Sequence, residues 1–319
     1  MKQVTVFAPI SIGNVSVGFD SLGLCLSPID GHLVGDTIRV IEHPENVLEV
    51  IGTYADRLPP EPDKNIVWDC LAAFNEALST IGREQETVKV VLEKNIPVSS
   101  GLGSSACSVV AAFDGLNQYY DKPFNEADLL QMMAVQEGKI SGSIHYDNIA
   151  PCYLGGMQLM TPNTAQPAME IPISDEHYWV MAYPDIVVCT KTAREVLPEQ
   201  YDRATAITFA QQLASFISAC HSGRYQQAFS FVKDVIAEPY RESMLPGYSA
   251  CREKLMAQGS LAVGISGSGP TIFSVHRTLE EARAAIAIIE TDYVTKPTGF
   301  TVICKVDHKG SRLVSEKEN

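Results

Sequence analysis

Positive charge is scarce in this sequence. Its 319 residues include 24 lysines and arginines against 38 aspartates and glutamates, and the formal net charge is -14. Binding to nucleic acid or to an anionic membrane surface depends on basic side chains near the negative partner. The charge balance therefore argues against both partner classes, and an anionic substrate would need a local binding site.

Long apolar segments are also missing. No stretch approaches the roughly 18 uninterrupted apolar residues of a membrane-spanning helix. The first residues, MKQVTVFAPISIG, lack an apolar core followed by a small-residue cleavage site. We expect a cytoplasmic protein.

Cysteine and histidine patterns typical of metal sites are absent. The 8 cysteines include no CxxC pair, and the 7 histidines show no HxH or HxxxH spacing. Zinc sites are marked by ligands at such spacings, and a chain of this size does not need disulfide staples. We expect reduced, mostly buried thiols and no zinc site.

Helical and strand-like periodicities are mixed along the chain. Strands are predicted over residues 4–9, 36–42, 88–94, 177–185, 261–266, 270–275 and 299–306. Helices are predicted over residues 68–81, 105–120, 125–138, 202–220, 224–238 and 279–293. This mixture predicts an α+β fold. A change in composition predicts two domains, 1–155 and 156–319.

The most informative motif is PVSSGLGSSA, which starts at Pro97 between a predicted strand and a predicted helix. Gly101 and Gly103 permit positive φ and a close approach of the backbone. The unpaired N–H groups and the dipole of the following helix favour an anion such as phosphate. The plainer alternative is a tight glycine turn with serine N-caps.

Two other kinds of phosphate loop fit this motif less well. A Walker loop ends in Gly-Lys-Ser/Thr, and residues 97–107 contain no lysine. A dinucleotide fingerprint needs an acid at the end of a second strand. Here the acids that follow, Asp121, Glu126 and Asp128, flank or enter a helix. The Walker loop is excluded and the dinucleotide site is disfavoured.

A second group of polar residues lies in EGKISGSIHYDN, from Glu137 to Asn148. Glu137 ends a predicted helix, where the dipole disfavours a carboxylate, so a magnesium ion shared with nucleotide phosphates would suit it. Otherwise it is a solvated surface glutamate. His145, Asp147 and Asn148 place an imidazole, a carboxylate and an amide in one turn, either as a site or as an Asx turn.

A third motif, GISGSGPT over residues 264–271, lies between two predicted strands. It is either a hairpin or a ligand-facing loop. It does not match the hydrolase motif G-x-S-x-G, because Ser268 stands where the final glycine belongs. A hydrolase is unsupported.

These three motifs, in this order, resemble the GHMP kinases, the superfamily that includes galactokinases, homoserine kinases and mevalonate kinases. Four further segments are similar to the homoserine kinase branch. They are NVSVGFDSLGL from Asn14, SGSIHYDNIAPCYLGGM from Ser141, TAREVLP from Thr192 and EPYRESMLPG from Glu238.

The resemblance implies an N-terminal domain like ribosomal protein S5, a ferredoxin-like C-terminal domain and an active site in the cleft between them. The implied reaction transfers a phosphoryl group from ATP to the hydroxyl of L-homoserine, giving O-phospho-L-homoserine and ADP in threonine biosynthesis. A homodimer is the family-level expectation. Another GHMP kinase, or a catalytically silent binding protein of this fold, stays an alternative.

The resemblance also implies roles for individual residues. Asn65 lies near adenine, and Ser105 and Glu137 hold Mg²⁺. The phosphates are wrapped by Pro97, Val98, Ser99, Ser100, Gly101, Leu102, Gly103, Ser104, Ser105, Ala106 and Cys107. Homoserine is bound by Asn14, Asp20, His145, Asp147, Arg194 and Arg241. In this set Asp20 would face the ammonium, and the two arginines the carboxylate.

Asp147 and Arg194 are the implied catalytic residues. Mevalonate kinases match Asp147 with a catalytic aspartate and pair it with a lysine near the N-terminus. Here Lys2 is the only lysine before residue 64, and it lies outside the matching motif. Asp147 is therefore either the base or a substrate ligand, with a phosphate oxygen taking the proton in the second case.

Overall fold

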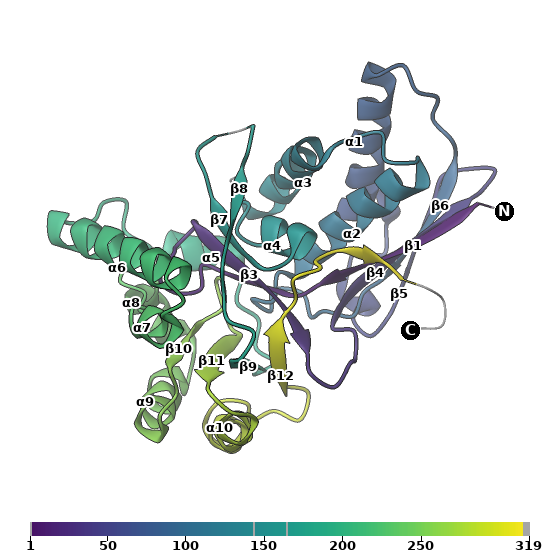
Figure 1. The fold of residues 1–319 in the computed structure, drawn as a ribbon. Helices are drawn as coiled ribbons and strands as arrows, with labels where there is room; N and C mark the ends of the chain where they lie inside the picture. The colour runs from purple at the N-terminus through teal and green to yellow at the C-terminus, as the bar shows by residue number, and fades with distance from the viewer. Residues whose placement is uncertain (1, 143, 164, 315–319) are drawn as a thin grey trace.

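The computed structural model describes residues 2–142, 144–163 and 165–314, which form two sheets with helices packed on them (Figure 1). The first sheet has the order β13-β1-β4-β6-β5, antiparallel except for the parallel pair β5 and β6. Its strands are β1 (Gln3–Pro9), β4 (Gly35–Glu42), β5 (Val47–Ile51), β6 (Val88–Glu93) and β13 (Arg312–Leu313). The mixture of sheets and helices confirms the α+β class.

Four helices pack on one another beside the first sheet: α1 (Ile66–Thr80), α2 (Ser104–Tyr119), α3 (Glu126–Ser141) and α4 (Ile149–Leu154). Helix α2 lies against β1 and β4 and is buried along almost its whole length. Its small residues permit this, since a Cβ at Gly115 would already lie 3.1 Å from a methyl group of Ile38. The sequence predicted this helix one residue later, at Ser105.

The second sheet has the order β10-β11-β9-β12-β3-β7-β8, with β2 paired to β3. Its strands are β2 (Ser11–Gly13), β3 (Leu22–Pro28), β7 (Met157–Met160), β8 (Ala168–Ile171), β9 (Tyr178–Tyr183), β10 (Ala262–Ile265), β11 (Ile272–His276) and β12 (Phe300–Val306). Strand β3 pairs with both β12 and β7, and β13 pairs with β1. Both sheets thus take strands from both halves of the chain, and the boundary near residue 155 stays a prediction.

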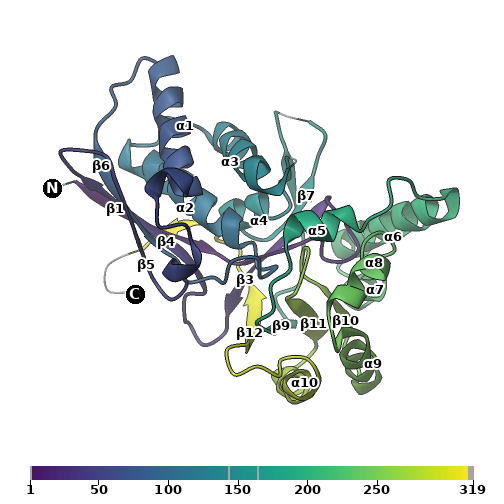
Figure 2. The same cartoon turned by 180° about the vertical axis from the view of Figure 1, so that it is seen from behind.

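The remaining α-helices are α5 (Thr190–Glu195), α6 (Arg203–His221), α7 (Tyr225–Ser230), α8 (Glu238–Arg241), α9 (Tyr248–Gln258) and α10 (Leu279–Asp292) (Figure 2). The continuous helix predicted over 224–238 is wrong. The carboxylate of Asp234 accepts hydrogen bonds from the N–H groups of Ile236, Ala237 and Glu238. Such local capping competes with the helix and starts a new one at Glu238.

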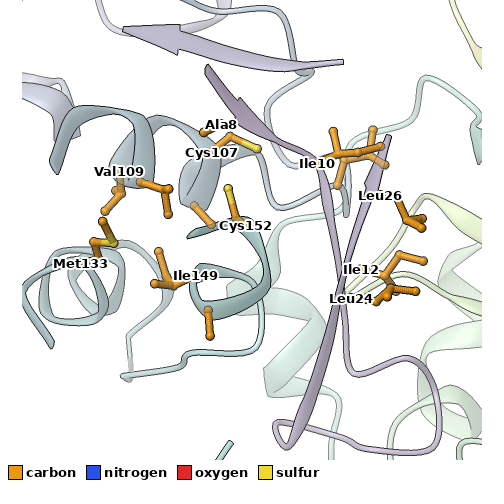
Figure 3. Close-up of a cluster of buried hydrophobic side chains, with 14 of the residues drawn as sticks. Ala8, Ile10, Ile12, Leu24, Leu26, Cys107, Val109, Met133, Ile149 and Cys152 are labelled. Carbon is orange, nitrogen blue, oxygen red and sulfur yellow. The ribbon is translucent and has the colours of Figure 1, made fainter. Parts of the chain in front are cut away.

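A tightly packed core joins α2 and α4 to the inner strands (Figure 3). Cys107 and Cys152 both donate to the carbonyl of Pro9, at 3.1 Å in each case. All eight cysteines lie in the described part of the chain; they are free, and only Cys189 among them is exposed. Within that part, no helix combines the length and apolar character needed to cross a membrane.

Candidate active site

One cavity of about 400 Å³ collects most of the residues that the sequence predicted. Its lining includes Asn14, Asp20, Asn65, Val98, Ser99, Ser100, Gly101, Gly103, Ser104, Ser105, Glu137, His145, Asp147, Arg194 and Arg241. Four predicted loop residues do not line it: Pro97, Leu102, Ala106 and Cys107 are buried. Pro97 has no N–H group, and the N–H groups of Leu102 and Cys107 donate to Ser100 Oγ (3.3 Å) and to the carbonyl of Gly103 (2.8 Å). These three residues therefore support the loop and do not themselves donate to a phosphate.

The loop between β6 and α2 forms the anion-binding end of this cavity. The backbone has positive φ at Ser99 (56°), Gly101 (80°) and Gly103 (68°), and Gly103 is the N-cap of α2. The N–H groups of Ser104 and Ser105 lie in the first helical turn and have no intrahelical acceptor. With the helix dipole they make a site for phosphate oxygens without any lysine in the loop.

A buried ion pair between Lys94 and Asp36 supports this loop from the side of the protein interior. Lys94 Nζ donates to Asp36 Oδ2 (2.5 Å), to the carbonyl of Ser104 (2.8 Å) and to Ser108 Oγ (3.1 Å). The other carboxylate oxygen of Asp36 accepts from the N–H groups of residues 95 and 96, at 3.0 and 3.2 Å. Lys94 also lines the cavity. Sequence reasoning missed this pair, although a lysine that ends an apolar strand just before the motif was a usable signal.

The third motif crosses over the phosphate loop. Ser266 Oγ donates to the carbonyl of Gly101 (2.6 Å), and the N–H of Thr271 donates to the carbonyl of Ser100 (3.0 Å). A Cβ at Gly101 would lie 2.7 Å from the carbonyl oxygen of Ser266, so glycine is required there. The segment joins β10 to β11 as a hairpin, and Gly267 and Ser268 line the cavity. The hairpin is therefore confirmed, and a ligand-binding role of residues 264–271 stays a prediction.

Ser105 and Glu137 form the candidate magnesium ligands. Ser105 Oγ donates to Glu137 Oε1 at 2.5 Å, at the mouth of the phosphate loop. Burial raises the pKa of Glu137 to about 7, with the nearby Asp147 charge adding to the rise. A buried carboxylate and a hydroxyl that face phosphate-binding N–H groups are the oxygen ligands that Mg²⁺ prefers. The two residues fit this ion, and a cation there would relieve the cost of the buried charge.

The opposite end of the cavity, which we call the substrate end, carries both signs of charge. Arg194 makes a bidentate pair with Asp20, with Nη1–Oδ2 and Nη2–Oδ1 distances of 3.1 and 2.8 Å. Asn14 Oδ1 accepts from the N–H of Asp20 at 2.8 Å, which orients this loop. His145 Nδ1 lies 3.7 Å from Asp20 Oδ2.

Arg241 reaches the substrate end from a buried position. It is 3% exposed, and its Nε and Nη1 donate to the carbonyls of Ala193 (2.9 Å) and Gly267 (3.0 Å). Burial lowers the pKa of this guanidinium. The ring of Phe19 lies 5.5 Å from the Arg241 guanidinium carbon and 5.8 Å from that of Arg194. Sequence reasoning missed this aromatic contact, whose signal was the phenylalanine next to Asp20.

Asp147 lies between the two ends and is 6% exposed. Burial, and then the charge of Asp20, raises its pKa to about 7. Gly13 leaves room for it, because a Cβ there would lie 2.6 Å from Asp147 Oδ2. Lys2 does not approach, since its ammonium lies 4.3 Å from the ring centroid of Tyr119 and 3.8 Å from Glu86 Oε1. Asn148 also lines the cavity, with Oδ1 accepting from Ser11 Oγ at 3.0 Å.

The chain is similar to known families and to solved structures. A family model described as "GHMP kinases N terminal domain" matches residues 65–156, and one described as "GHMP kinases C terminal" matches residues 216–295. Together they cover more than half of the chain.

Among solved structures, a homoserine kinase from Cytophaga hutchinsonii is 27% identical, with 98% of each chain covered and a TM-score of 0.89. A mevalonate kinase from L. major, solved with R-mevalonate, is 13% identical, with 94% of this chain and 95% of that chain covered and a TM-score of 0.65. A phosphomevalonate kinase from Streptococcus pneumoniae is 10% identical, with 98% and 99% covered and a TM-score of 0.70. The last two similarities concern the fold alone.

Proposed function

The chain belongs to the GHMP kinase family, whose kinases are ATP-dependent phosphotransferases, and from this premise we propose that it phosphorylates L-homoserine. The products are O-phospho-L-homoserine and ADP. The observation that carries the proposal is the substrate end of the cavity, where one carboxylate and two guanidinium groups lie beside the phosphate-binding loop. A zwitterionic amino acid needs both signs of charge, whereas a sugar or a hydroxy acid does not.

Homoserine would divide the pair formed by Arg194 and Asp20. Its ammonium takes the carboxylate of Asp20, and its carboxylate takes the planar forks of Arg194 and Arg241. Both guanidinium carbons lie near the ring of Phe19, at 5.8 and 5.5 Å from its centroid, so the two arginines are close enough for one carboxylate to bind both. The side-chain hydroxyl then extends toward Asp147 and the phosphate loop, which lie in the same cavity.

Phosphoryl transfer depends mainly on alignment and on neutralising phosphate charge. The backbone of residues 98–105 aligns the phosphates, and Asn65 lies at the cavity wall beside Lys64, where an adenine base would bind. A Mg²⁺ ion held by Ser105 and Glu137 would supply charge neutralisation on the phosphates. Threonine biosynthesis is the pathway that this reaction would serve.

Asp147 is assigned here as a ligand of the substrate hydroxyl. Among the residues that the structure describes, the charges that act on Asp147 come from Asp20, Arg194 and Arg241. Lys94, the buried lysine of the cavity, is engaged by Asp36 and Ser104. Proton removal can follow phosphoryl transfer in a loose transition state, with a phosphate oxygen as acceptor.

The decisive experiment measures ADP release with L-homoserine, L-serine, L-threonine, galactose and mevalonate as acceptors. We expect kcat/KM on homoserine to exceed that on galactose or mevalonate at least about 100-fold, because those acceptors leave Asp20 without its ammonium partner. Serine and threonine keep both charges but hold their hydroxyl one bond closer to Cα, so kcat/KM on them should be about 10- to 100-fold lower than on homoserine. Preference for galactose or mevalonate would identify another GHMP kinase. Binding of ATP without turnover on any acceptor would identify a silent binding protein.

A further inference from the structure

Arg241 is a buried cation at the substrate end of the cavity, with 3% of its surface exposed. The backbone carbonyls of Ala193 and Gly267 accept hydrogen bonds from its Nε and Nη1. Among the residues that the structure describes, none accepts a hydrogen bond from its Nη2. A guanidinium with unused N–H groups is suited to a carboxylate. Whatever holds Arg241 in this place therefore affects how the substrate carboxylate binds.

The helix that carries Arg241 is too short to orient it unaided. Helix α8 (Glu238–Arg241) has 4 residues, and Arg241 is the last of them. The N–H of Arg241 donates to the carbonyl of Ala237, at 3.0 Å. A single helical turn fixes several backbone angles for very few hydrogen bonds, so it is unstable by itself. Contacts from outside the helix must determine the direction in which Arg241 leaves it.

Asp234 supplies these contacts. Its carboxylate accepts hydrogen bonds from the N–H groups of Ile236 (2.7 Å), Ala237 (2.8 Å) and Glu238 (3.1 Å). One side chain thus satisfies three N–H groups at the start of α8. The hydroxyl of Tyr201 donates to the carbonyl of Ile236 at 3.0 Å and holds the same segment. Asp234 is not part of the cavity lining, so it acts on the site from behind the wall.

Asp234 also balances the charge of Arg241. Burial lowers the pKa of the Arg241 guanidinium, and the carboxylate of Asp234 is the charge that opposes this effect most strongly. The charge of Arg194 adds to the lowering, because the two arginines repel each other. Asp20 attracts Arg241 as well, but it is paired with Arg194 and would turn to the substrate ammonium. Asp234 stays available to Arg241 whether or not substrate is bound.

We propose that Asp234 is a positioning residue for substrate binding, which acts through Arg241 and does not touch the substrate. The proposal rests on the proposed function, because it concerns the carboxylate of an amino-acid substrate. The cap at the start of α8 sets the direction of the last side chain of this helix. The negative charge of the same residue offsets the repulsion between Arg241 and Arg194.

Steady-state kinetics of Asp234→Ala test the proposal. The KM for homoserine should rise about 10- to 30-fold, the factor that corresponds to the loss of a helix cap. The kcat should stay within about threefold of wild type and the KM for ATP should not change, since the phosphate loop is untouched. Asp234→Asn keeps a side-chain carbonyl oxygen for the cap and loses the charge. Its KM for homoserine should lie between those of wild type and Asp234→Ala.

Asp202→Ala is the matched control. Asp202 is the N-cap of α6, where its carboxylate accepts from the N–H of Thr205 at 2.7 Å, and it does not line the cavity. Both alanine variants should lower the midpoint of urea denaturation, because each removes a helix cap. Only Asp234→Ala should raise the KM for homoserine. An equal rise in Asp202→Ala would show that any lost cap weakens the site and would overturn the proposal.

A double variant tests whether Asp234 acts through Arg241. Arg241→Lys already lacks the planar fork, so adding Asp234→Ala should raise the KM less than about threefold further. The full 10- to 30-fold rise on top of Arg241→Lys would exclude action through Arg241.

The outcomes for wild type and variants separate this proposal from the proposed function. If wild type phosphorylates homoserine and Asp234→Ala has an unchanged KM, the role of Asp234 is overturned and the proposed function stands. If the alanine variant does not fold, an unchanged KM in Asp234→Asn overturns the role in the same way. A wild type that does not phosphorylate homoserine would overturn both.

Discussion

The two ends of the cavity are built in different ways. The phosphate end is mostly backbone, held by the buried pair of Asp36 and Lys94 and by the crossing segment 264–271. The substrate end is made of side chains from four separate parts of the chain: Asn14 and Asp20, His145, Arg194, and Arg241. Changes beneath the phosphate loop should therefore alter stability, and changes at the substrate end should alter substrate binding alone.

The largest effect is expected for Asp36→Asn, beneath the phosphate loop. Asp36 is fully buried and accepts from Lys94, Ser108 and two backbone N–H groups. Asparagine removes the negative charge that balances Lys94. Its NH₂ group would also face N–H or O–H groups that now donate to the carboxylate. We expect a loss of about 3–5 kcal/mol in the free energy of unfolding, measured by urea denaturation.

The control for this variant is Asp121→Asn, because Asp121 is exposed. It should change the unfolding free energy by no more than about 0.5 kcal/mol. A stable Asp36→Asn protein with unchanged kinetics would break the comparison, since the phosphate loop would then need no support from the ion pair.

Glu137→Gln is expected to have the next largest effect. Glutamine keeps the shape of the side chain and removes its charge, so kcat/KM should fall about 100- to 1,000-fold. The Mg²⁺ concentration that gives half-maximal rate should rise steeply. Glu126→Gln, an exposed position of the same helix, should leave both quantities unchanged. Unaltered magnesium dependence would remove Glu137 from the metal site.

The pH dependence of stability separates the charge of Glu137 from its shape. The folded protein raises the pKa of this carboxyl to about 7, above its ordinary value. Between the ordinary pKa of 4.5 and about 7, the folded state holds a proton on this carboxyl that the unfolded state has lost. The free energy of unfolding therefore falls as the pH rises through this range, and the loss is complete above about 7. Without Mg²⁺, Glu137→Gln should be more stable than wild type at pH 8 and equally stable at pH 4. Equal stability at both values would contradict the raised pKa.

Arg194→Lys tests the substrate end. A lysine keeps the charge but loses the planar fork, so the KM for homoserine should rise about 100-fold while the KM for ATP is unchanged. The pair with Asp20 is partly exposed, with side-chain exposures of 27% and 29%, so stability should change little. Arg283→Lys on α10 is the exposed control. A large loss of stability in Arg194→Lys would show that the substrate end is also structural.

The same difference decides what the sequence could reveal. Residues 97–105 are contiguous, and glycines at 101 and 103 indicate a backbone with positive φ, so the phosphate loop was predictable. Asp36 and Lys94 are far apart in sequence, and nothing local distinguishes a buried pair from surface charges. Arg241 depends on the break that Asp234 makes between α7 and α8, which helical periodicity alone did not predict. The substrate residues were reached through the resemblance and not through spacing.

Asp147→Asn gives the smallest expected change and sharpens the comparison at the place where the two ends meet. Loss of one hydrogen bond to a charged group should raise the KM for homoserine about tenfold. Measured at saturating homoserine, kcat should stay within about threefold of wild type, since alignment carries most of the rate. Asp63→Asn, at an exposed aspartate, is the control.

A fall in kcat of about 100-fold or more, with KM unchanged, would instead make Asp147 the base. Its pKa near 7, raised by burial, would then be seen as a rise in wild-type kcat through neutral pH that the asparagine variant lacks.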